Sequence, residues 1–133
     1  MSPTDFFEDL GFAKIDHSRK ARNGFAEVVF CEGKTPDQVA QIALSILNHA
    51  DNLLATRADL QHYEAIQAVA ADADYNPRAR VITVKRFPTI TTGVVAVVSA
   101  GTADQPVAEE AALTAEALGC QVKRFSDVGV AGL

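Results

Sequence analysis

Val94-Val-Ala-Val-Val-Ser-Ala-Gly-Thr-Ala-Asp104 and the run from Glu109 to Gly119 carry the clearest indication of how this chain folds. Val94–Val98 is apolar and mostly β-branched, too short for a helix, and typical of a strand buried on both faces of a parallel sheet. Small and polar residues follow it, and Pro106 suits the first turn of a helix. Gln121–Phe125 is the next predicted strand. This order of strand, tight loop, helix and strand predicts a βαβ unit.

A second α/β pattern precedes this unit. Thr35 is a predicted N-cap, and Pro36 fits the first position of a helix that continues to about Ala50. Apolar residues recur on one stripe of that helix: Val39, Ile42, Ala43, Ile46, Leu47 and Ala50. Further strands are predicted at 25–31, 52–56 and 80–85, a second helix from about Asp59, and a turn at 75–79. A short helix from Ser2, with Phe6, Phe7 and Leu10 on one face and Gly11 at its end, is predicted before them.

The predicted fold class is therefore α/β, in two parts. Residues 1–88 form a small mixed α/β domain that we expect to fold independently, and 86–93, with Pro88 and a Thr/Gly cluster, form a linker. Residues 93–133 form the opening βαβ of a flavodoxin-like parallel sheet, which is an incomplete domain. Such a sheet leaves apolar faces and strand edges uncovered, so we expect a homo-oligomer.

Composition narrows the classes of function. The net charge of −5 argues against a nucleic-acid binder, which carries a basic face. We also expect no membrane span and no signal peptide, which makes a cytoplasmic location the default. Cys31 and Cys120 show neither metal nor disulfide spacing, and His49 and His62 are interpreted as surface residues, so no metal site is predicted.

Gly33-Lys34-Thr35 has the end of a phosphate-binding P-loop sequence. That motif also needs a glycine five residues before Gly33, where this chain has Val28. We therefore reject a P-loop.

The candidate site lies where the two strands of the predicted βαβ unit end. Ser99, Gly101, Thr102 and Asp104 follow the first strand, where loop amides, hydroxyls and the positive end of a helix bind anionic groups. A plain βα turn, with Asp104 only complementing the helix dipole, explains this loop equally well. The loop after the second strand adds three residues at the same edge if the strands are parallel neighbours: Asp127, Gly129 and Gly132.

The segment Lys14–Gly24 concentrates cations in an acidic chain. Its Arg19 and Arg22 are suited to hold phosphate or carboxylate in a bidentate manner. A solvated surface segment is the alternative.

These motifs together resemble the LarB family, the pyridinium-3,5-biscarboxylic acid mononucleotide synthases. The resemblance rests on Ser99-Ala-Gly-Thr-Ala-Asp104 with Asp127-Val-Gly-Val-Ala-Gly-Leu133, and on a set of upstream matches: Asp16, Arg19, Arg22, Gly24, Glu27-Val-Val-Phe, Gly33-Lys-Thr-Pro36 and Leu54-Ala-Thr-Arg57. The second part of that family is similar to class I aminoimidazole ribonucleotide (AIR) carboxylase.

The resemblance implies an enzyme in the biosynthesis of the nickel-pincer nucleotide, which is the cofactor of lactate racemase. Such enzymes carboxylate the pyridinium ring of nicotinic acid adenine dinucleotide (NaAD) at C5, using CO2 or bicarbonate, and release AMP. A cysteine thiolate adds to the ring to make it nucleophilic. No tightly bound cofactor is implied, with Mg2+ possible.

The resemblance also implies that the nucleophilic cysteine lies beyond Leu133, where family members continue. We therefore expect no catalytic residue in this chain and an inactive fragment, with Cys31 and Cys120 as buried or half-buried residues. Two alternatives remain: a non-catalytic nucleotide-binding or oligomerisation module, and an AIR mutase-like enzyme of purine biosynthesis.

Overall fold

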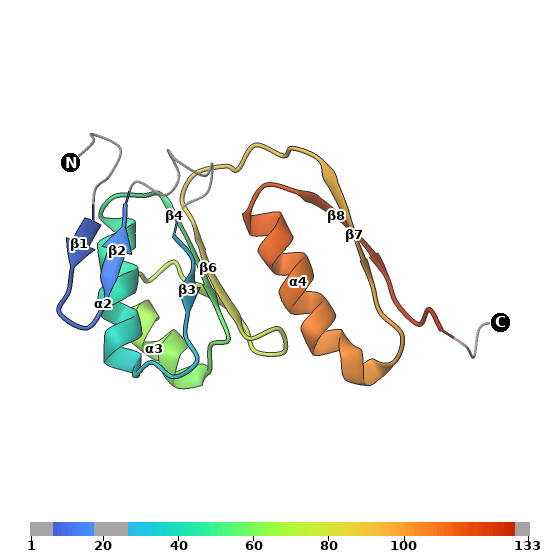
Figure 1. The fold of residues 1–133 in the computed structure, drawn as a ribbon, viewed down its shortest axis with the longest axis horizontal. Helices are drawn as coiled ribbons and strands as arrows, with labels where there is room; N and C mark the ends of the chain where they lie inside the picture. The colour runs from blue at the N-terminus through green and yellow to red at the C-terminus, as the bar shows by residue number, and fades with distance from the viewer. Residues whose placement is uncertain (1–6, 18–26, 130–133) are drawn as a thin grey trace.

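The computed structural model describes residues 7–17 and 27–129 and has the predicted α/β class (Figure 1). The first part contains β1 (Phe7–Asp9), β2 (Lys14–Asp16), β3 (Val29–Phe30), α2 (Pro36–Leu47), β4 (Asn52–Thr56), α3 (Leu60–Val69), β5 (Asp74–Asn76) and β6 (Val81–Lys85). The second part contains β7 (Val94–Val98), a 3-10 turn (Thr102–Asp104), α4 (Gln105–Ala117) and β8 (Gln121–Phe125).

A four-stranded sheet in the order β3-β4-β6-β5 forms the centre of the first part. β3 and β4 are parallel and are connected through α2, whereas β6 runs antiparallel to both of its neighbours. The start of α2 is as predicted: the Thr35 side chain accepts from the Gln38 amide, and the Gln38 side chain accepts from the Thr35 amide. This capping box satisfies two amides that a helix start leaves without partners.

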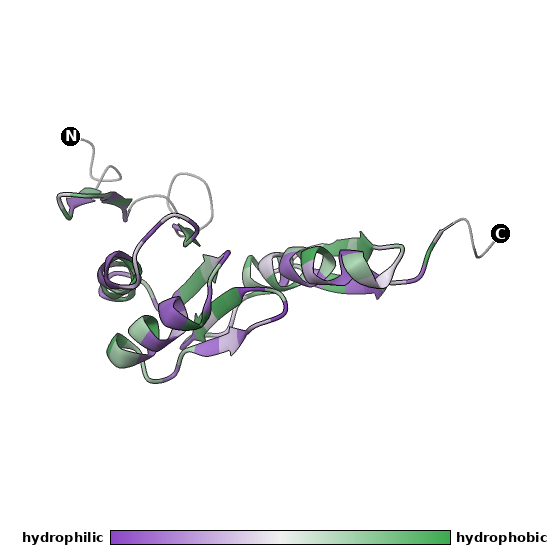
Figure 2. Cartoon of the chain, turned by 90° about the horizontal axis from the view of Figure 1, so that it is seen from below, coloured by the Kyte–Doolittle hydropathy of each residue, from purple (hydrophilic) through white to green (hydrophobic). Residues whose placement is uncertain are grey.

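The sheet is buried on both faces, by different helices. On one face Leu53, Ala55, Ile82 and Val84 pack with residues of α2 and α3 in the main core. On the other, Leu54 and Val81 form a smaller cluster with Ala79, against which Leu113 and Ala117 of α4 pack. Figure 2 shows these hydrophobic strands between α2 and α3 on one side and α4 on the other. The second part of the chain thus completes the covering of the first.

The prediction that β7 and β8 are parallel neighbours joined by a helix is confirmed. The prediction that β7 is buried on both faces is wrong for the described chain, since Val94 and Val98 are 59% and 60% exposed. Arg124 of β8 forms ion pairs with Glu109 and Glu116 of α4. The helix therefore covers the face of the β7–β8 sheet on which Arg124 lies. The opposite face, with Val94, Ala96, Val98 and Phe125, has no covering layer among the described residues.

The linker between the two parts is held at both ends. The Asn52 side chain accepts from the amides of Arg86 and Phe87 and donates to the Phe87 carbonyl, all within 3.0 Å. The Arg86 guanidinium also pairs with Asp72 through two contacts of 2.9 and 3.0 Å. At the far end, the amide of Thr92 donates to the carbonyl of Gly119 over 2.6 Å. The division at residues 88–93 stays a prediction.

The predicted N-terminal helix is wrong over the part that the structure describes. β1 pairs antiparallel with β2, so Phe7 lies in a hairpin. Gly11, taken as a helix end, has φ +89° and forms the turn, where its amide donates to Asp9 Oδ1 over 2.8 Å. A left-handed glycine ends helices and closes tight turns equally well, so the local signal was ambiguous.

Three smaller corrections concern element boundaries. Tyr75 and Asn76, predicted as turn, belong to β5, which pairs with β6 before the turn begins. α2 ends at Leu47 rather than near Ala50, and within the described residues the strand predicted from Phe25 is confined to Val29–Phe30. No described helix is long and apolar enough to cross a bilayer.

Candidate functional site

The two candidate loops meet at one edge of the β7–β8 sheet, as predicted. Because the strands are parallel and in register from Val94–Gln121 to Val98–Phe125, both of their carboxyl ends face the same way. The amide of Ser99 donates to the Phe125 carbonyl over 2.9 Å, and the amide of Val128 donates to the Ser99 carbonyl over 3.0 Å. A Cβ placed on Gly129 would lie 3.6 Å from the Ala100 Cβ. The loops are therefore in direct contact.

The first loop positions a carboxylate at the start of α4. Asp104 ends the 3-10 turn, and its Oδ2 accepts from the Gly101 amide over 3.2 Å. Gly101, Thr102 and Asp104 are exposed and Ser99 is half-buried, so these groups are accessible to a ligand. The bond to Gly101 shows that Asp104 also orders its own loop, so the structural and binding roles are compatible.

The second loop carries an unusual backbone conformation. Asp127 has φ +59°, which lies in the left-handed region that residues other than glycine seldom adopt. Aspartate tolerates this region better than most residues, and such conformations cluster at functional sites. Asp127 and Gly129 are exposed. Gly132, Arg19 and Arg22 lie outside the described residues.

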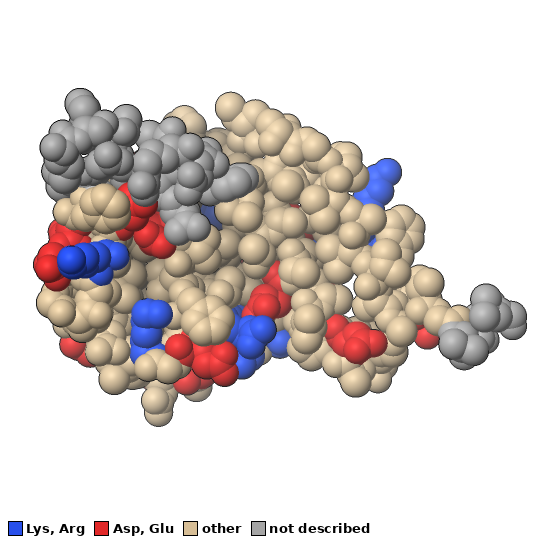
Figure 3. Space-filling view, in the orientation of Figure 1, with Lys and Arg blue, Asp and Glu red and all other residues tan. Residues whose placement is uncertain are grey.

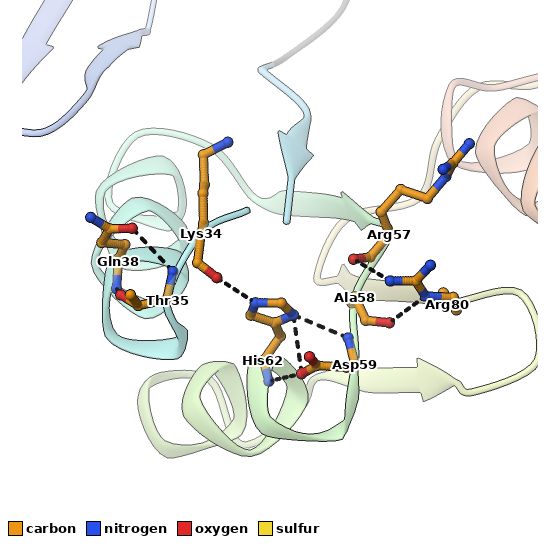
Figure 4. Close-up of polar contacts among 8 residues, drawn as sticks. All are labelled: Lys34, Thr35, Gln38, Arg57, Ala58, Asp59, His62 and Arg80. Atoms are coloured by element: carbon orange, nitrogen blue, oxygen red, sulfur yellow. Dashed lines mark hydrogen bonds and ion pairs between the residues drawn. The ribbon is translucent and has the colours of Figure 1, made fainter. Parts of the chain in front are cut away.

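A second polar cluster lies at the carboxyl ends of β3 and β4, and sequence reasoning missed it (Figure 4). Arg57 and Arg80 both have left-handed backbones, with φ +54° and +58°. The Arg80 guanidinium donates to the carbonyls of Arg57 and Ala58 over 3.3 Å, and the Ala58 amide donates to the Arg80 carbonyl over 2.9 Å. Arg80 is thus used to close the sheet end.

Two cations, one from the loop after β3 and one that follows β4, approach an exposed aromatic ring. The Lys34 ammonium and the Arg57 guanidinium are each 6.0 Å from the ring centroid of Phe30, which is 49% exposed. Lys34 Nζ also donates to the Phe30 carbonyl over 2.6 Å, rather than projecting into a phosphate-binding loop. This geometry agrees with the rejection of a P-loop.

Arg57 also links the two parts of the chain. Its Nε lies 2.8 Å from Oε2 of Glu110 on α4, and its Nη1 lies 3.5 Å from Oε2 of Glu32. The helix that follows the first candidate loop is therefore tied to the sheet of the first part.

His62 is not the surface residue that was predicted. It is 6% exposed, and it forms a capping box with Asp59 in which the His62 amide donates to Asp59 Oδ1 and His62 Nδ1 accepts from the Asp59 amide. Since Nδ1 accepts, Nε2 carries the proton and donates to the Lys34 carbonyl over 2.8 Å. The spacing of an N-cap residue and a hydrogen-bonding side chain at N3 was the available signal.

Ser45, His17 and Glu8 form a third cluster, which resembles a nucleophile with its base. The Ser45 hydroxyl donates to Glu8 Oε2 and lies 3.1 Å from His17 Nε2. Burial and the nearby His49 lower the pKa of His17, and the hydrogen bond from Ser45 lowers the pKa of Glu8. Ser45 is only 4% exposed and its proton is directed to Glu8, so this cluster holds the β1–β2 hairpin on α2. His49 is exposed, as predicted, but its ring stacks on His17 at 3.8 Å.

Charge on the visible face is mixed rather than segregated. Figure 3 shows Lys and Arg lying among Asp and Glu on this face. Within residues 7–17 and 27–129, no group of three or more His, Cys, Asp or Glu side chains is arranged to hold a metal ion.

Comparison with known proteins agrees with the resemblance. An uncharacterised protein of Methanocaldococcus jannaschii is 30% identical over 135 residues, an alignment that covers 90% of this chain and 50% of that protein. The chain thus spans about half the length of this curated relative. The family model described as the LarB/PurE-like N-terminal domain matches residues 7–86, from the β1–β2 hairpin to the end of the four-stranded sheet. The chain therefore belongs to the LarB family.

Proposed function

We propose that this chain supplies the nucleotide-holding loops of an enzyme that carboxylates the pyridinium ring of NaAD at C5 and hydrolyses its phosphoanhydride to release AMP. The LarB/PurE-like domain indicates a carboxylase-like enzyme family. The observation that carries the finer assignment is the direct contact between the Ser99–Asp104 loop and the Asp127–Gly129 loop at the carboxyl ends of parallel strands. In open α/β sheets, nucleotides bind at such an edge.

In this proposal each loop group has a defined task. The hydroxyls of Ser99 and Thr102 and the nearby amides hold phosphate or carboxylate oxygens. Asp104 and Asp127 accept hydrogen bonds from ribose hydroxyls or face the ring. Catalysis needs in addition a thiolate that adds to the pyridinium ring, which lets C5 attack CO2, and that is eliminated afterwards.

Neither cysteine of this chain suits that step. Burial raises the pKa of the Cys31 thiol to about 11, so it stays protonated at neutral pH. Cys120 directly precedes β8 whereas Asp127 follows its end, and a five-residue strand separates them by about 16 Å. The proposal therefore places the nucleophile outside these residues and predicts that this chain alone is inactive.

A titration separates the proposal from its alternatives. Backbone NMR of the 133-residue chain would follow the Gly101 and Gly129 amides while NaAD, AMP or AIR is added. We expect NaAD and AMP to shift both amides, because both glycines lie in the contacting loops. An assembly module would respond to none of the three, and a purine-pathway enzyme would respond to AIR at the lowest concentration.

Activity provides the second test. Purified chain incubated with NaAD and bicarbonate should release no AMP, since it lacks the thiolate. In a family member that contains the complete second domain, substituting asparagine at the position of Asp104 or Asp127 should lower turnover while leaving the unfolding temperature within a few degrees. Release of AMP by this chain alone would contradict the placement of the nucleophile, and Cys120 would then be the residue to substitute.

A further inference from the structure

A small cavity of about 270 Å³ lies beside the contacting loops, between α4 and the ends of β7 and β8. It is lined by Arg78, Val97, Ser99, Gln105, Ala108, Glu109, Arg124, Phe125 and Ser126. Ser99 belongs both to this cavity and to the first loop, so the cavity adjoins the candidate nucleotide site. Pockets that hold whole ligands start at about 300 Å³, so this one fits part of a nucleotide rather than all of it.

Arg78 is the cavity residue that comes from the first part of the chain. It lies in the turn between β5 and β6, and its Nη2 donates to Oε1 of Gln105 in the first turn of α4. The turn itself is fixed, because Asn76 Oδ1 accepts from the Ala79 amide over 2.9 Å and Ala79 is buried in the cluster on which α4 packs. The backbone at Arg78 is therefore held by the hydrogen bond between Asn76 and Ala79 and by the burial of Ala79.

The charges around the cavity are unevenly compensated. The Arg124 guanidinium lies 2.7 Å from Glu109 and 3.0 Å from Glu116, so carboxylates neutralise it. Gln105, the partner of Arg78, is a neutral amide, and no carboxylate among the described residues pairs with Arg78. Arg78 is exposed and so has a guanidinium edge available to a ligand, and the cavity that it lines is also lined by two hydroxyl-bearing residues, Ser99 and Ser126.

We propose that this cavity binds an anionic group, a phosphate or a carboxylate, and that Arg78 is its cationic ligand. This inference rests on the proposed function for the ligand's remaining contacts, made by the loops at Ser99 and Asp127. It adds that the LarB/PurE-like N-terminal domain takes part in substrate binding, because Arg78 belongs to that domain. A guanidinium and two hydroxyls match the acceptor oxygens of either anion.

The test uses the whole chain and three probes: inorganic phosphate, AMP and nicotinate. Arg78→Gln should weaken the binding of AMP by about five- to tenfold, and Arg78→Lys should recover part of the loss because it keeps the charge but not the fork. Lys123→Gln is the matched control. Lys123 precedes Arg124 on β8 and lies opposite Ala96 on the face of the sheet away from α4. Its substitution therefore removes one positive charge outside the cavity.

The outcomes distinguish the two proposals. If Arg78→Gln and Lys123→Gln weakened the binding of AMP equally, or if Arg78→Gln did not weaken it at all, this inference would be wrong. The proposed function would still hold in that case if AMP shifted the Gly101 and Gly129 amides. If phosphate binding depended on Arg78 but AMP did not shift those amides, the anion site would stand and the nucleotide assignment would fall. A stronger Arg78 dependence for nicotinate than for phosphate would identify the carboxylate as the bound group.

Discussion

Substituting Gly119 with alanine should destabilise the protein more than any other glycine substitution at a described position. Gly119 is buried, has φ +94°, and ends the turn after α4. A Cβ there would lie 2.8 Å from the backbone carbonyl oxygen of Ile90 and 3.1 Å from the Thr89 methyl carbon. The linker crosses Gly119 at this point, and the 2.6 Å hydrogen bond from Thr92 leaves it little freedom to move away.

The magnitude follows from two terms. Holding a residue with a Cβ in the left-handed region costs about 1–2 kcal/mol. Displacing a packed backbone to admit an extra carbon costs about 1–3 kcal/mol. The expected loss is therefore about 2–5 kcal/mol, a large part of the roughly 5–15 kcal/mol by which domains are stable. With an m-value of about 1.5 kcal/mol/M, a loss of 3 kcal/mol lowers the urea midpoint by about 2 M.

Two other glycines separate these terms. Gly33 has φ +81° and open space around its Cβ position, so Gly33→Ala should cost only the backbone term. Gly101 has φ −97° and equally open space, so Gly101→Ala should be neutral or stabilising by about 0.4–1 kcal/mol through the unfolded chain. Urea unfolding followed by circular dichroism measures all three. A loss of stability for Gly119→Ala no larger than that for Gly33→Ala would contradict the predicted steric clash with Ile90.

Arg57→Glu and Glu110→Arg should each weaken the docking of α4 by about 1 kcal/mol or less, because the ion pair is partly exposed. The double exchange should restore part of the lost stability in thermal melts, whereas additive losses would contradict a direct pair. The pKa of His17 is lower in the folded chain than the ordinary histidine value of 6.5, so below pH 6.5 the unfolded chain binds more protons than the folded one. Stability should therefore fall as the pH drops from about 6.5 towards the lower pKa of the folded chain. His17→Asn should flatten this decline between pH 7.5 and 5.5, and an unchanged slope would show that another group titrates. Phe125→Glu should reduce self-association measured by light scattering at tens of micromolar, because it places a charge on the uncovered sheet face; a wild-type monomer at that concentration would remove the basis for this expectation.

Local signals in the sequence were sufficient for the regular elements. The N-cap at Thr35, the proline after it and the apolar stripe from Val39 predicted α2, and the structure confirms each of them. The order of strand, loop and helix from Val94 predicted that Ser99 and Asp127 would come to one edge, and their loops are in contact. Such signals succeed because capping and periodicity depend on residues within a few positions of one another.

Interpretations failed where a partner outside the local pattern decides the structure. The sequence around His62 is typical of a surface residue, but its ring is buried and forms a hydrogen bond with the carbonyl of Lys34, 28 positions away. The left-handed backbones of Arg57 and Arg80 carry no compositional signal, because arginine is not a residue that predicts such a conformation. The helix or hairpin choice at Gly11 likewise depended on the pairing of β1 with β2.

The α/β class, the family and the two loops that the proposed function uses were all predictable from the amino-acid sequence. Three features depend on the packing of whole elements: α4 covers the second face of the first sheet, Arg57 reaches Glu110 across 53 positions, and Arg78 and Ser99 line the same cavity. This difference arises because an apolar residue indicates only that its side chain will be buried, and a charged residue only that its side chain will be solvated or paired. The partner of each is chosen when whole elements pack, because hydrophobic burial has no direction and a single polar contact contributes only about 1 kcal/mol.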